Sequence, residues 1–145
     1  MARISEAIGR YGEHLTAASL CLLGSDLVSI IPHGSHADIV FEYNNVVYKV
    51  QVKTKTRQRL YKKDGKFKRT GWNFDLRRSK HTKNRSYGAE GQNEIDMYAL
   101  VCIPYNNIMF VPFSNKKKIT VSDKKMKSVD ALESLKLTIQ ALRQN

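Results

Sequence analysis

The stretch that decides the fold is His36–Lys53, HADIVFEYNNVVYKVQVK. Two runs rich in Val, Ile, Phe and Tyr flank Asn44-Asn45, which predicts two β-strands joined by a two-residue turn. Asn tolerates the positive φ angles that such a turn needs. In this register, residues whose numbers sum to 89 stand opposite each other. The alternation then predicts an apolar core face made of Ile39, Phe41, Tyr43, Val46, Tyr48, Val50 and Val52.

The opposite face of the same hairpin gathers polar side chains. Asp38 stands across from Gln51, and Lys53 stands across from His36, so Asp38, Gln51 and Lys53 cluster on one face. A carboxylate, an amide oxygen and a lysine suit a hard cation such as Mg²⁺ beside a phosphate. The lysine would hold a water or stabilise charge on the phosphoryl oxygens. Polar alternation is also the ordinary appearance of a half-buried strand, so a solvated hairpin is the alternative from these residues alone.

These residues resemble the core motif of the PD-(D/E)XK nuclease superfamily. There an Asp opens the second strand, and an acid, any residue and a Lys follow on the third; Asp38 and Gln51-Val52-Lys53 match that order. Ala37 stands where a Pro is expected, and Gln51 replaces the acid, as in Mrr-like restriction enzymes and small intron-associated endonucleases. The phrases YKVQVKTK, GWNFDLRR and NEIDMYALVCIPYNNIMFVPFS also resemble the latter group, so the resemblance spans roughly residues 3–115.

The resemblance implies a metal site and a role for each of its residues. It implies that Glu13, within GEHL on a first helix, points at the metal and supplies the negative charge that Gln51 lacks. Without the resemblance, Glu13 is an ordinary solvated acid on a helix surface. Asp38, the Gln51 side-chain oxygen and the Val52 carbonyl would complete the metal shell, and Lys53 would orient the attacking water. The expected cofactor is Mg²⁺, for which Mn²⁺ should substitute.

Length and composition describe a globular protein with one domain over residues 1–145. Its hydrophobic fraction is 41%, and no apolar run approaches the length of a membrane span. Cys21 and Cys102 lie far apart, so we expect two free, buried thiols in a reducing compartment. The N-terminal stretch MARISEAIGRYGEH lacks an apolar signal core. These features predict a cytoplasmic protein, associated with nucleoid or viral DNA and not secreted.

Residues 53–85 hold the whole formal charge excess of the chain. They contain 14 Lys or Arg against two acids, a net +12, which equals the net charge of all 145 residues. Asp64-Gly65 is a strong hairpin turn signal within this basic segment. Aromatic residues lie between the charges, namely Tyr61, Phe67, Trp72 and Phe74.

A basic hairpin with interleaved aromatic residues, followed by a strand through Trp72–Leu76, suits a nucleic-acid surface. The alternative is a solvated or disordered basic loop; a membrane surface is less favoured because no amphipathic basic helix is present. We therefore expect a DNA-binding insertion over about residues 54–90. Its predicted DNA contacts are Lys55, Arg57, Arg59, Lys62, Lys63, Lys66, Lys68, Arg69, Arg77, Arg78, Lys80, Lys83 and Arg85.

The N-terminal part predicts a helix over residues 4–23, with Ser5 as N-cap and Gly24 as its stop. One buried stripe of this helix is expected from three- and four-residue spacing, made of Ile4, Ile8, Tyr11, Leu15, Ala18 and Leu22. A short strand follows at Leu27–Ile31. His33 and His36 flank the entry to the next strand, and His36 is a candidate to support Lys53.

The C-terminal part predicts two strands, Met97–Ile103 and Ile108–Pro112, joined by a Pro-Tyr-Asn-Asn turn. Asp96 at the strand entry is expected to be structural. Residues 116–118 and 124–125 form a second basic patch. Ser128 is expected to cap a last helix, whose apolar stripe is Val129, Leu132, Leu135, Ile139 and Leu142.

The order of these elements predicts an α/β domain with a central mixed sheet packed by the first and last helices. The preferred function is a Mg²⁺-dependent DNA endonuclease. The resemblance implies sequence-selective, homing-type cleavage of duplex DNA by a homodimer or a tetramer, since two sites are needed to cut both strands. One alternative is a four-way (Holliday) junction resolvase acting on branched DNA. Another is a DNA-binding module that has lost catalysis, because Gln51 removes one charge from the site.

Overall fold

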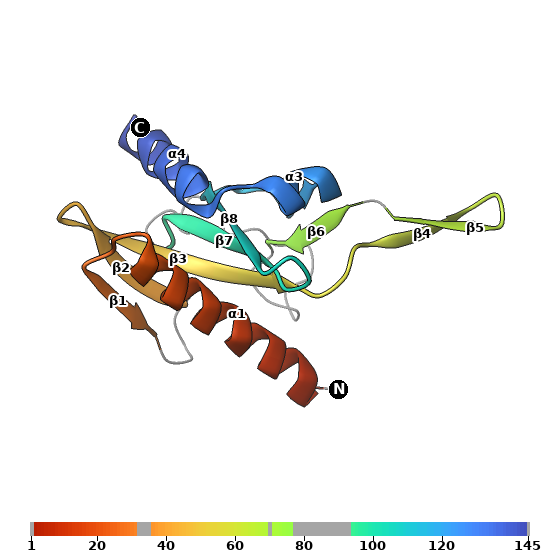
Figure 1. The fold of residues 1–145 in the computed structure, drawn as a ribbon, viewed down its shortest axis with the longest axis horizontal. Helices are drawn as coiled ribbons and strands as arrows, with labels where there is room; N and C mark the ends of the chain where they lie inside the picture. Colours follow the sequence, from red (N-terminus) through yellow and green to blue (C-terminus); the bar gives the residue numbers. More distant parts are fainter. Residues whose placement is uncertain (1, 32–35, 70, 77–93, 145) are drawn as a thin grey trace.

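The centre of the molecule is a five-stranded mixed sheet with the order β1-β2-β3-β7-β8 (Figure 1). The computed structural model describes residues 2–31, 36–69, 71–76 and 94–144. The β3 and β7 strands are parallel, whereas the other three neighbouring pairs are antiparallel. This confirms the predicted α/β class with a mixed sheet. The strands are β1 (Leu27–Ile30), β2 (Ile39–Tyr43), β3 (Val46–Lys55), β7 (Met97–Cys102) and β8 (Asn107–Pro112).

The β2–β3 hairpin has the predicted register, in which Tyr43 pairs with Val46 and Ile39 pairs with Val50. Asn44 and Asn45 have φ angles of 51° and 64°. These left-handed values match the right-handed twist of the flanking strands, which explains the choice of two asparagines. The predicted core face is largely buried, although Val46 beside the turn is exposed.

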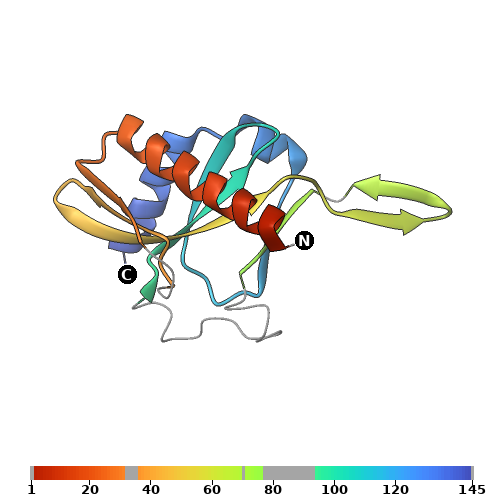
Figure 2. The ribbon, with the colours of Figure 1, turned by 90° about the horizontal axis from the view of Figure 1, so that it is seen from below.

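Two helices, α1 (Ala2–Leu22) and α4 (Ala131–Arg143), cover one face of the sheet (Figure 2). Their packing confirms the prediction that the first and last helices flank it. The predicted cap of the last helix was wrong. Asp130 caps α4 by accepting a hydrogen bond from the Glu133 N–H at 2.9 Å, whereas Ser128 ends the short helix α3 (Asp123–Ser128).

The other face of the sheet is covered by α3 and by a two-stranded sheet, β6 (Trp72–Asp75) with β9 (Lys118–Val121). Of the four aromatic residues between the basic charges, Trp72 and Phe74 are buried in this second core, whereas Tyr61 and Phe67 are exposed. Alternation along β6 explains this, because Trp72 and Phe74 point inward from one face of the strand.

Asp123, at the start of α3, is a polar hub above this second core. Its Oδ1 accepts hydrogen bonds from Gln58 Nε2, Trp72 Nε1 and Tyr105 Oη. These partners come from the segment after β3, from β6 and from the β7–β8 turn. One carboxylate therefore ties four separate parts of the chain together.

Helix α1 begins at Ala2, so Ser5 lies inside it and the predicted N-cap was wrong. Gly24 does stop the helix, because its φ of 97° is left-handed and the Ser25 N–H donates back to Leu20 O at 3.0 Å. The predicted buried stripe is largely exposed, with Ile4 at 60% and Leu22 at 90%. Cys21 is also exposed, contrary to the sequence prediction, whereas Cys102 is buried.

The side of α1 that faces the sheet is formed by Gly12, Thr16 and Leu20. The helix lies so close to β3 that a Cβ on Gly12 would be 1.8 Å from Thr54 Oγ1. The small side chains at Gly12 and Thr16 thus set which side of the helix packs, with Leu20 buried beside them, whereas Ile4, Tyr11 and Leu22 lie on an exposed flank. Among the described residues, no helix is long and apolar enough to cross a membrane.

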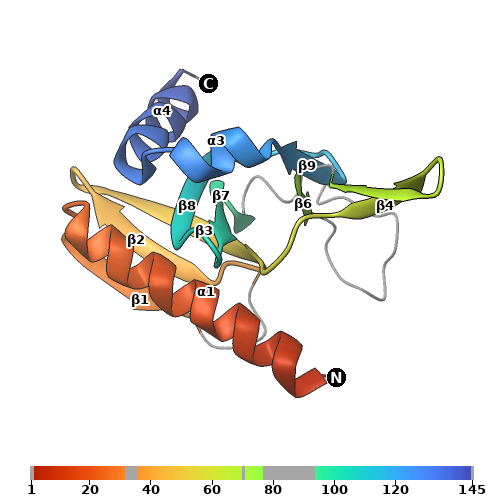
Figure 3. The same ribbon diagram turned by 45° about the vertical axis from the view of Figure 1, so that its right-hand side comes forward.

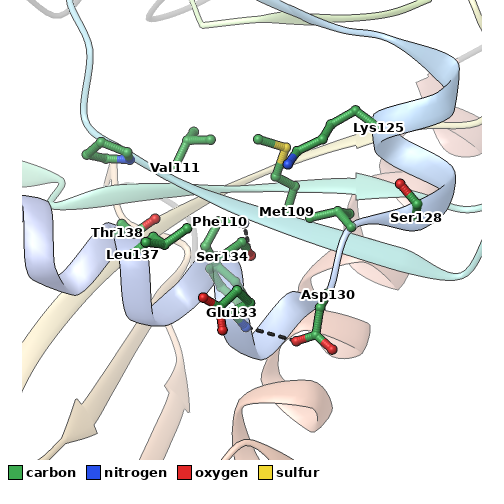
Figure 4. A pocket seen from close by; sticks show the side chains of 12 residues that line it. Met109, Phe110, Val111, Lys125, Ser128, Asp130, Glu133, Ser134, Leu137 and Thr138 are labelled. Carbon is green, nitrogen blue, oxygen red and sulfur yellow. Dashed lines mark hydrogen bonds between the residues drawn. The ribbon is translucent and has the colours of Figure 1, made fainter.

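Strand β8 lies at one edge of the sheet, and its outward N–H groups are all occupied. Ile108 N donates to Asn107 Oδ1 and Phe110 N donates to Ser134 Oγ, both at 3.0 Å. Pro112 has no N–H to offer. Figure 4 shows Ser134 beside Phe110, in a cavity of about 340 Å³ between β8, α3 and α4. That cavity contains none of the predicted site residues.

Candidate active site and nucleic-acid interface

Asp38 is held at the start of β2 by backbone and side-chain hydrogen bonds. Its N–H donates to Val50 O, and its carbonyl accepts from Ile31 N, both at 2.8 Å. Its carboxylate Oδ2 accepts from Val52 N at 2.8 Å. These bonds hold the carboxylate between β1 and β3. The first two residues of the predicted motif, Asp38 and Gln51, meet at this point.

Glu13 reaches this carboxylate from α1, and a hydrogen bond joins the two carboxyl groups. Burial raises the pKa of Glu13 to about 7, with further contributions from the charge of Asp38 and from that hydrogen bond, while Arg10 acts in the opposite direction. The two groups are 25 residues apart in the chain (38 minus 13). The close packing of α1 on β3 through Gly12 brings them together.

Lys53 lies half-buried on β3, near the same carboxylate. Burial lowers the pKa of its ammonium group, whereas the charges of Asp38 and Asp75 raise it. Asp75 ends β6 and was not among the predicted site residues. The alternation of WNFD, with Trp72 and Phe74 inward, placed Asp75 on the outer face, but nothing in the sequence indicated that β6 packs beside β3.

Gln51 stands on β3 between Lys49 and Lys53, and its amide Nε2 donates to His36 O at 3.1 Å. This bond orients the amide. The N–H and C=O of one strand residue point to the same side. Because Val52 N donates to Asp38, the Val52 carbonyl also points toward the Asp38 side. His36 itself pairs with Glu94, with 3.2 Å between Nε2 and Oε2.

The basic segment contains a second hairpin, β4 (Leu60–Lys63) and β5 (Lys66–Arg69), that projects from the body (Figures 1 and 2). The predicted turn is confirmed, since Asp64 and Gly65 have φ angles of 52° and 75°. Every residue of both strands is exposed. Pairing puts Leu60, Lys62, Phe67 and Arg69 on one face and Tyr61, Lys63, Lys66 and Lys68 on the other.

Two adjoining grooves lie along the segment that joins Lys53 to this hairpin. The first, about 660 Å³, runs between the N-terminal half of α1 and residues 54–59, and includes Lys55, Arg57 and Arg59. The second, about 410 Å³, shares Lys55 and Arg59 with the first and adds Lys117 and Lys118 from the β9 side. The structure thus joins part of the second basic patch to the first, which the sequence order did not reveal.

Asp96 is structural as expected, because its Oδ2 accepts from Lys49 N at 2.8 Å. Of the other three lysines of the second patch, Lys116 precedes β9, and Lys124 and Lys125 lie on α3. Several residues singled out in the sequence lie outside the described residues, namely His33 and the predicted DNA contacts Arg77, Arg78, Lys80, Lys83 and Arg85.

No family model and no curated protein matches this chain. Solved structures do. The fold is similar to that of a bacterial homing endonuclease. That structure, I-Ssp6803I, is similar over 96% of this chain and 94% of its own, with a TM-score of 0.54 and 15% sequence identity. At this identity the likeness shows a shared fold and leaves the chemistry to be argued from the residues.

Proposed function

We propose that this chain is a metal-dependent DNA endonuclease that hydrolyses phosphodiester bonds. The observation that carries the proposal is the meeting of Glu13, Asp38 and Lys53 at one point, from α1, β2 and β3. The molecule has a net charge of +12, and basic grooves begin at the residues that follow Lys53 on β3. Similarity in fold to a homing endonuclease supports the same reaction class.

The donor set fits a divalent cation such as Mg²⁺ or Mn²⁺. Two carboxyl groups in hydrogen-bond contact repel each other when both are ionised, and a cation between them removes that repulsion. Glu13 and Asp38 would hold it, together with the amide oxygen of Gln51 and the carbonyl of Val52. The amide oxygen of Gln51 is buried, and Gln51 lies on the same face of the hairpin as Asp38. A cation at this face would therefore meet oxygen donors from α1, β2 and β3. When bound, the cation would polarise the phosphate and acidify a water.

The residues of the chain would do the remaining work. Asp38 is held rigidly by Val52 N, so its other carboxylate oxygen keeps a fixed direction. Lys53 lies beside it, and partial burial strengthens the interaction of its ammonium group with a phosphate oxygen. Lys53 would orient the attacking water and stabilise the charge that develops on the phosphoryl group.

The DNA backbone would follow the basic grooves and the β4–β5 hairpin. A two-stranded β-ribbon fits the major groove of B-DNA, and this hairpin stands clear of the body. We also propose the homing type of substrate, sequence-selective double-strand cleavage, which calls for two copies of the site in a homodimer or a tetramer. A four-way junction is the competing substrate within the same chemistry.

The test is cleavage of a supercoiled plasmid, a random linear duplex library and a mobile four-way junction, with Mg²⁺, Mn²⁺ or EDTA. Asp38→Asn and Lys53→Ala should each lower the cleavage rate by ~100-fold or more. Binding of duplex DNA, measured in Ca²⁺, should stay within about twofold of wild type. Cutting in EDTA, or cutting that survives Asp38→Asn, contradicts the metal site.

The matched controls are Lys49→Ala and Glu133→Ala. Lys49 lies on β3 like Lys53, and Glu133 is an exposed acid on α4. Both variants should cut at the wild-type rate, which shows that loss of one charge does not by itself stop cleavage. A chain that binds DNA and cuts none of the three substrates would be a binding module.

A further inference from the structure

The exposed flank of α1 has the sequence pattern of a helix-pairing seam. Along the helix, apolar residues follow one another at intervals of 4, 3, 4, 3 and 4 positions, ending at Leu22. Such 3-4 spacing is the repeat by which two helices pack side by side. The described structure gives this seam no partner helix along its exposed residues, because Ile4, Tyr11 and Leu22 are 60%, 50% and 90% exposed. The seam consists of Ile4, Ile8, Tyr11, Leu15, Ala18 and Leu22. Of these, Ile8 and Leu15 are half-buried, and Leu15 also packs against the central core.

The N-terminal turns of α1 strengthen the case for a partner. Residues 3–7 are exposed on all sides, and in Figures 1 and 3 this end of the helix extends away from the sheet. Short helical extensions are marginal in water unless they pack on something. At the other end of α1, Leu22 and the neighbouring Leu27 of β1 are exposed as well. The helix thus carries an apolar patch at each end.

The seam is complementary to itself when two copies run antiparallel. Its residue numbers pair to a constant sum of 26, so Ile4 meets Leu22 of a second copy. Ile8 then meets Ala18, and Tyr11 meets Leu15. A two-fold axis near residue 13 brings the protruding first turns of one copy onto the Leu22–Leu27 patch of the other. The antiparallel arrangement also places opposite ends of the two helix dipoles together.

Charge favours a second copy over nucleic acid or a lipid surface. The positions that flank the seam carry no Lys, Arg, Asp or Glu; they are Ser5, Ala7, Gly12, His14, Ser19 and Cys21. The groove with Lys55, Arg57 and Arg59 borders only the N-terminal end of the seam, at Ser5 and Ile8. In the antiparallel pair the N-terminal ends of the two seams lie at opposite ends of the interface, so in a chain with a net charge of +12 the two copies do not bring these cations together. DNA and anionic membranes select cationic flanks, which are absent from these six positions.

We propose that α1 is the self-association surface of this protein, through an antiparallel pair with α1 of a second copy. This α1–α1 pair would form the interface of the homodimer or tetramer that the proposed endonuclease requires. It rests on the helix, however, and its test uses no DNA and no cleavage, so the two proposals fail separately.

The first experiment measures assembly by sedimentation between ~1 and ~100 μM, where a modest helix–helix interface dissociates. The wild-type chain should form dimers, and Ile4→Lys or Leu22→Glu should raise the dissociation constant by ~100-fold or more, because each buries an unpaired charge twice. Both side chains are exposed in the monomer, so circular dichroism should show an unchanged fold. The combined Ile4→Lys/Leu22→Glu variant should regain dimers, since opposite charges then meet across the two-fold axis.

The matched control is Leu137→Glu, on α4, whose side chain is 57% exposed. It should dimerise like wild type. A chain that stays monomeric throughout the range overturns the proposal, and so does a dimer that Leu137→Glu breaks and Leu22→Glu does not. Binding of monomers to anionic vesicles through Leu22 would overturn it in favour of a lipid surface.

The second experiment fixes the direction of pairing. Ala7 and Cys21 are exposed flanking positions that come together between antiparallel copies. A short bismaleimide should cross-link Ala7→Cys chains through position 7 of one copy and Cys21 of the other, and should leave Ala7→Cys/Cys21→Ser chains uncrosslinked. Efficient cross-linking of the wild-type chain through Cys21 alone would indicate parallel helices and overturn the antiparallel pair.

Discussion

Gly12 decides how closely α1 approaches β3, and Gly12→Ala tests that contact. The added Cβ would meet Thr54 Oγ1 at 1.8 Å and Thr54 Cβ at 2.9 Å, distances that force a displacement. Alanine favours the helix by about 1 kcal/mol, whereas overpacking of a well-filled contact costs about 1–3 kcal/mol. With a clash this severe we expect the upper part of that range, hence a net loss of about 2 kcal/mol in the free energy of unfolding.

Gly9 supplies the matched control, because a Cβ there meets nothing within 4 Å. Gly9→Ala should therefore stabilise the protein by about 0.5–1 kcal/mol. Urea denaturation of both variants measures the difference, which we expect to be about 3 kcal/mol. The combined Gly12→Ala/Thr54→Ala variant should recover part of the loss, since it removes Oγ1 but keeps the Thr54 Cβ position.

Cleavage provides a second readout of the same change. Glu13 follows Gly12 directly, so a helix displaced by about 1 Å moves its carboxyl group away from Asp38. Misplacement on this scale costs ~10²-fold in rate. Gly12→Ala should cut ~10–100-fold more slowly, while Gly9→Ala cuts like wild type. Equal stability of the two variants within about 0.5 kcal/mol would refute the close contact between α1 and β3.

Three further outcomes are expected. The first concerns the β4–β5 hairpin, with Ala in place of Lys62, Lys63, Lys66 and Lys68. The slope of log affinity for duplex DNA against log salt should fall in magnitude by about 2–4, because each phosphate that the protein no longer neutralises contributes about 0.9. An unchanged slope means that the hairpin points away from DNA. In a Mg²⁺ titration of cleavage, Gln51→Glu should lower the concentration for half-maximal cutting and Gln51→Ala should raise it, whereas three overlapping curves would remove Gln51 from the metal shell. Hydrogen bonds from Tyr105 and Trp72 lower the pKa of Asp123, so the ionised carboxylate stabilises the fold fully above the usual Asp pKa, and this stabilisation is lost as pH falls through the lowered pKa. Asp123→Asn should therefore flatten the loss of stability below about pH 4. An equally steep loss in urea unfolding would contradict the stabilising role of these hydrogen bonds to Asp123.

The β2–β3 hairpin could be predicted in full because its determinants are local. Asn44 and Asn45 select the turn, the turn sets the register, and strict alternation sets the core face. The same holds for Asp64-Gly65. By contrast, β9 and α3 were missed because the stretch KKKITVSDKKMK is dominated by lysines, and a four-residue strand leaves little pattern between them.

The stripe on α1 was predicted correctly as a pattern and wrongly as a core. Periodicity indicates that Ile4, Tyr11 and Leu22 share one side of a helix, and it carries no information about what covers that side. Packing was decided instead by Gly12, where a missing side chain admits the neighbouring strand. For the site, the hairpin register brought Asp38 to Gln51, but Glu13 came only from the family resemblance and Asp75 from the tertiary fold.

The closed edge of β8 limits how copies of this sheet can join. A sheet grows into a fibre only when strands can add at both ends, because each new copy must offer an acceptor for the next. Here Asn107, Ser134 and Pro112 leave β8 without an outward donor, so within the described sheet the β1 end is the edge at which an added strand can pair fully. Association of this kind stops at two copies, so the protein can be concentrated without polymerising through its sheet.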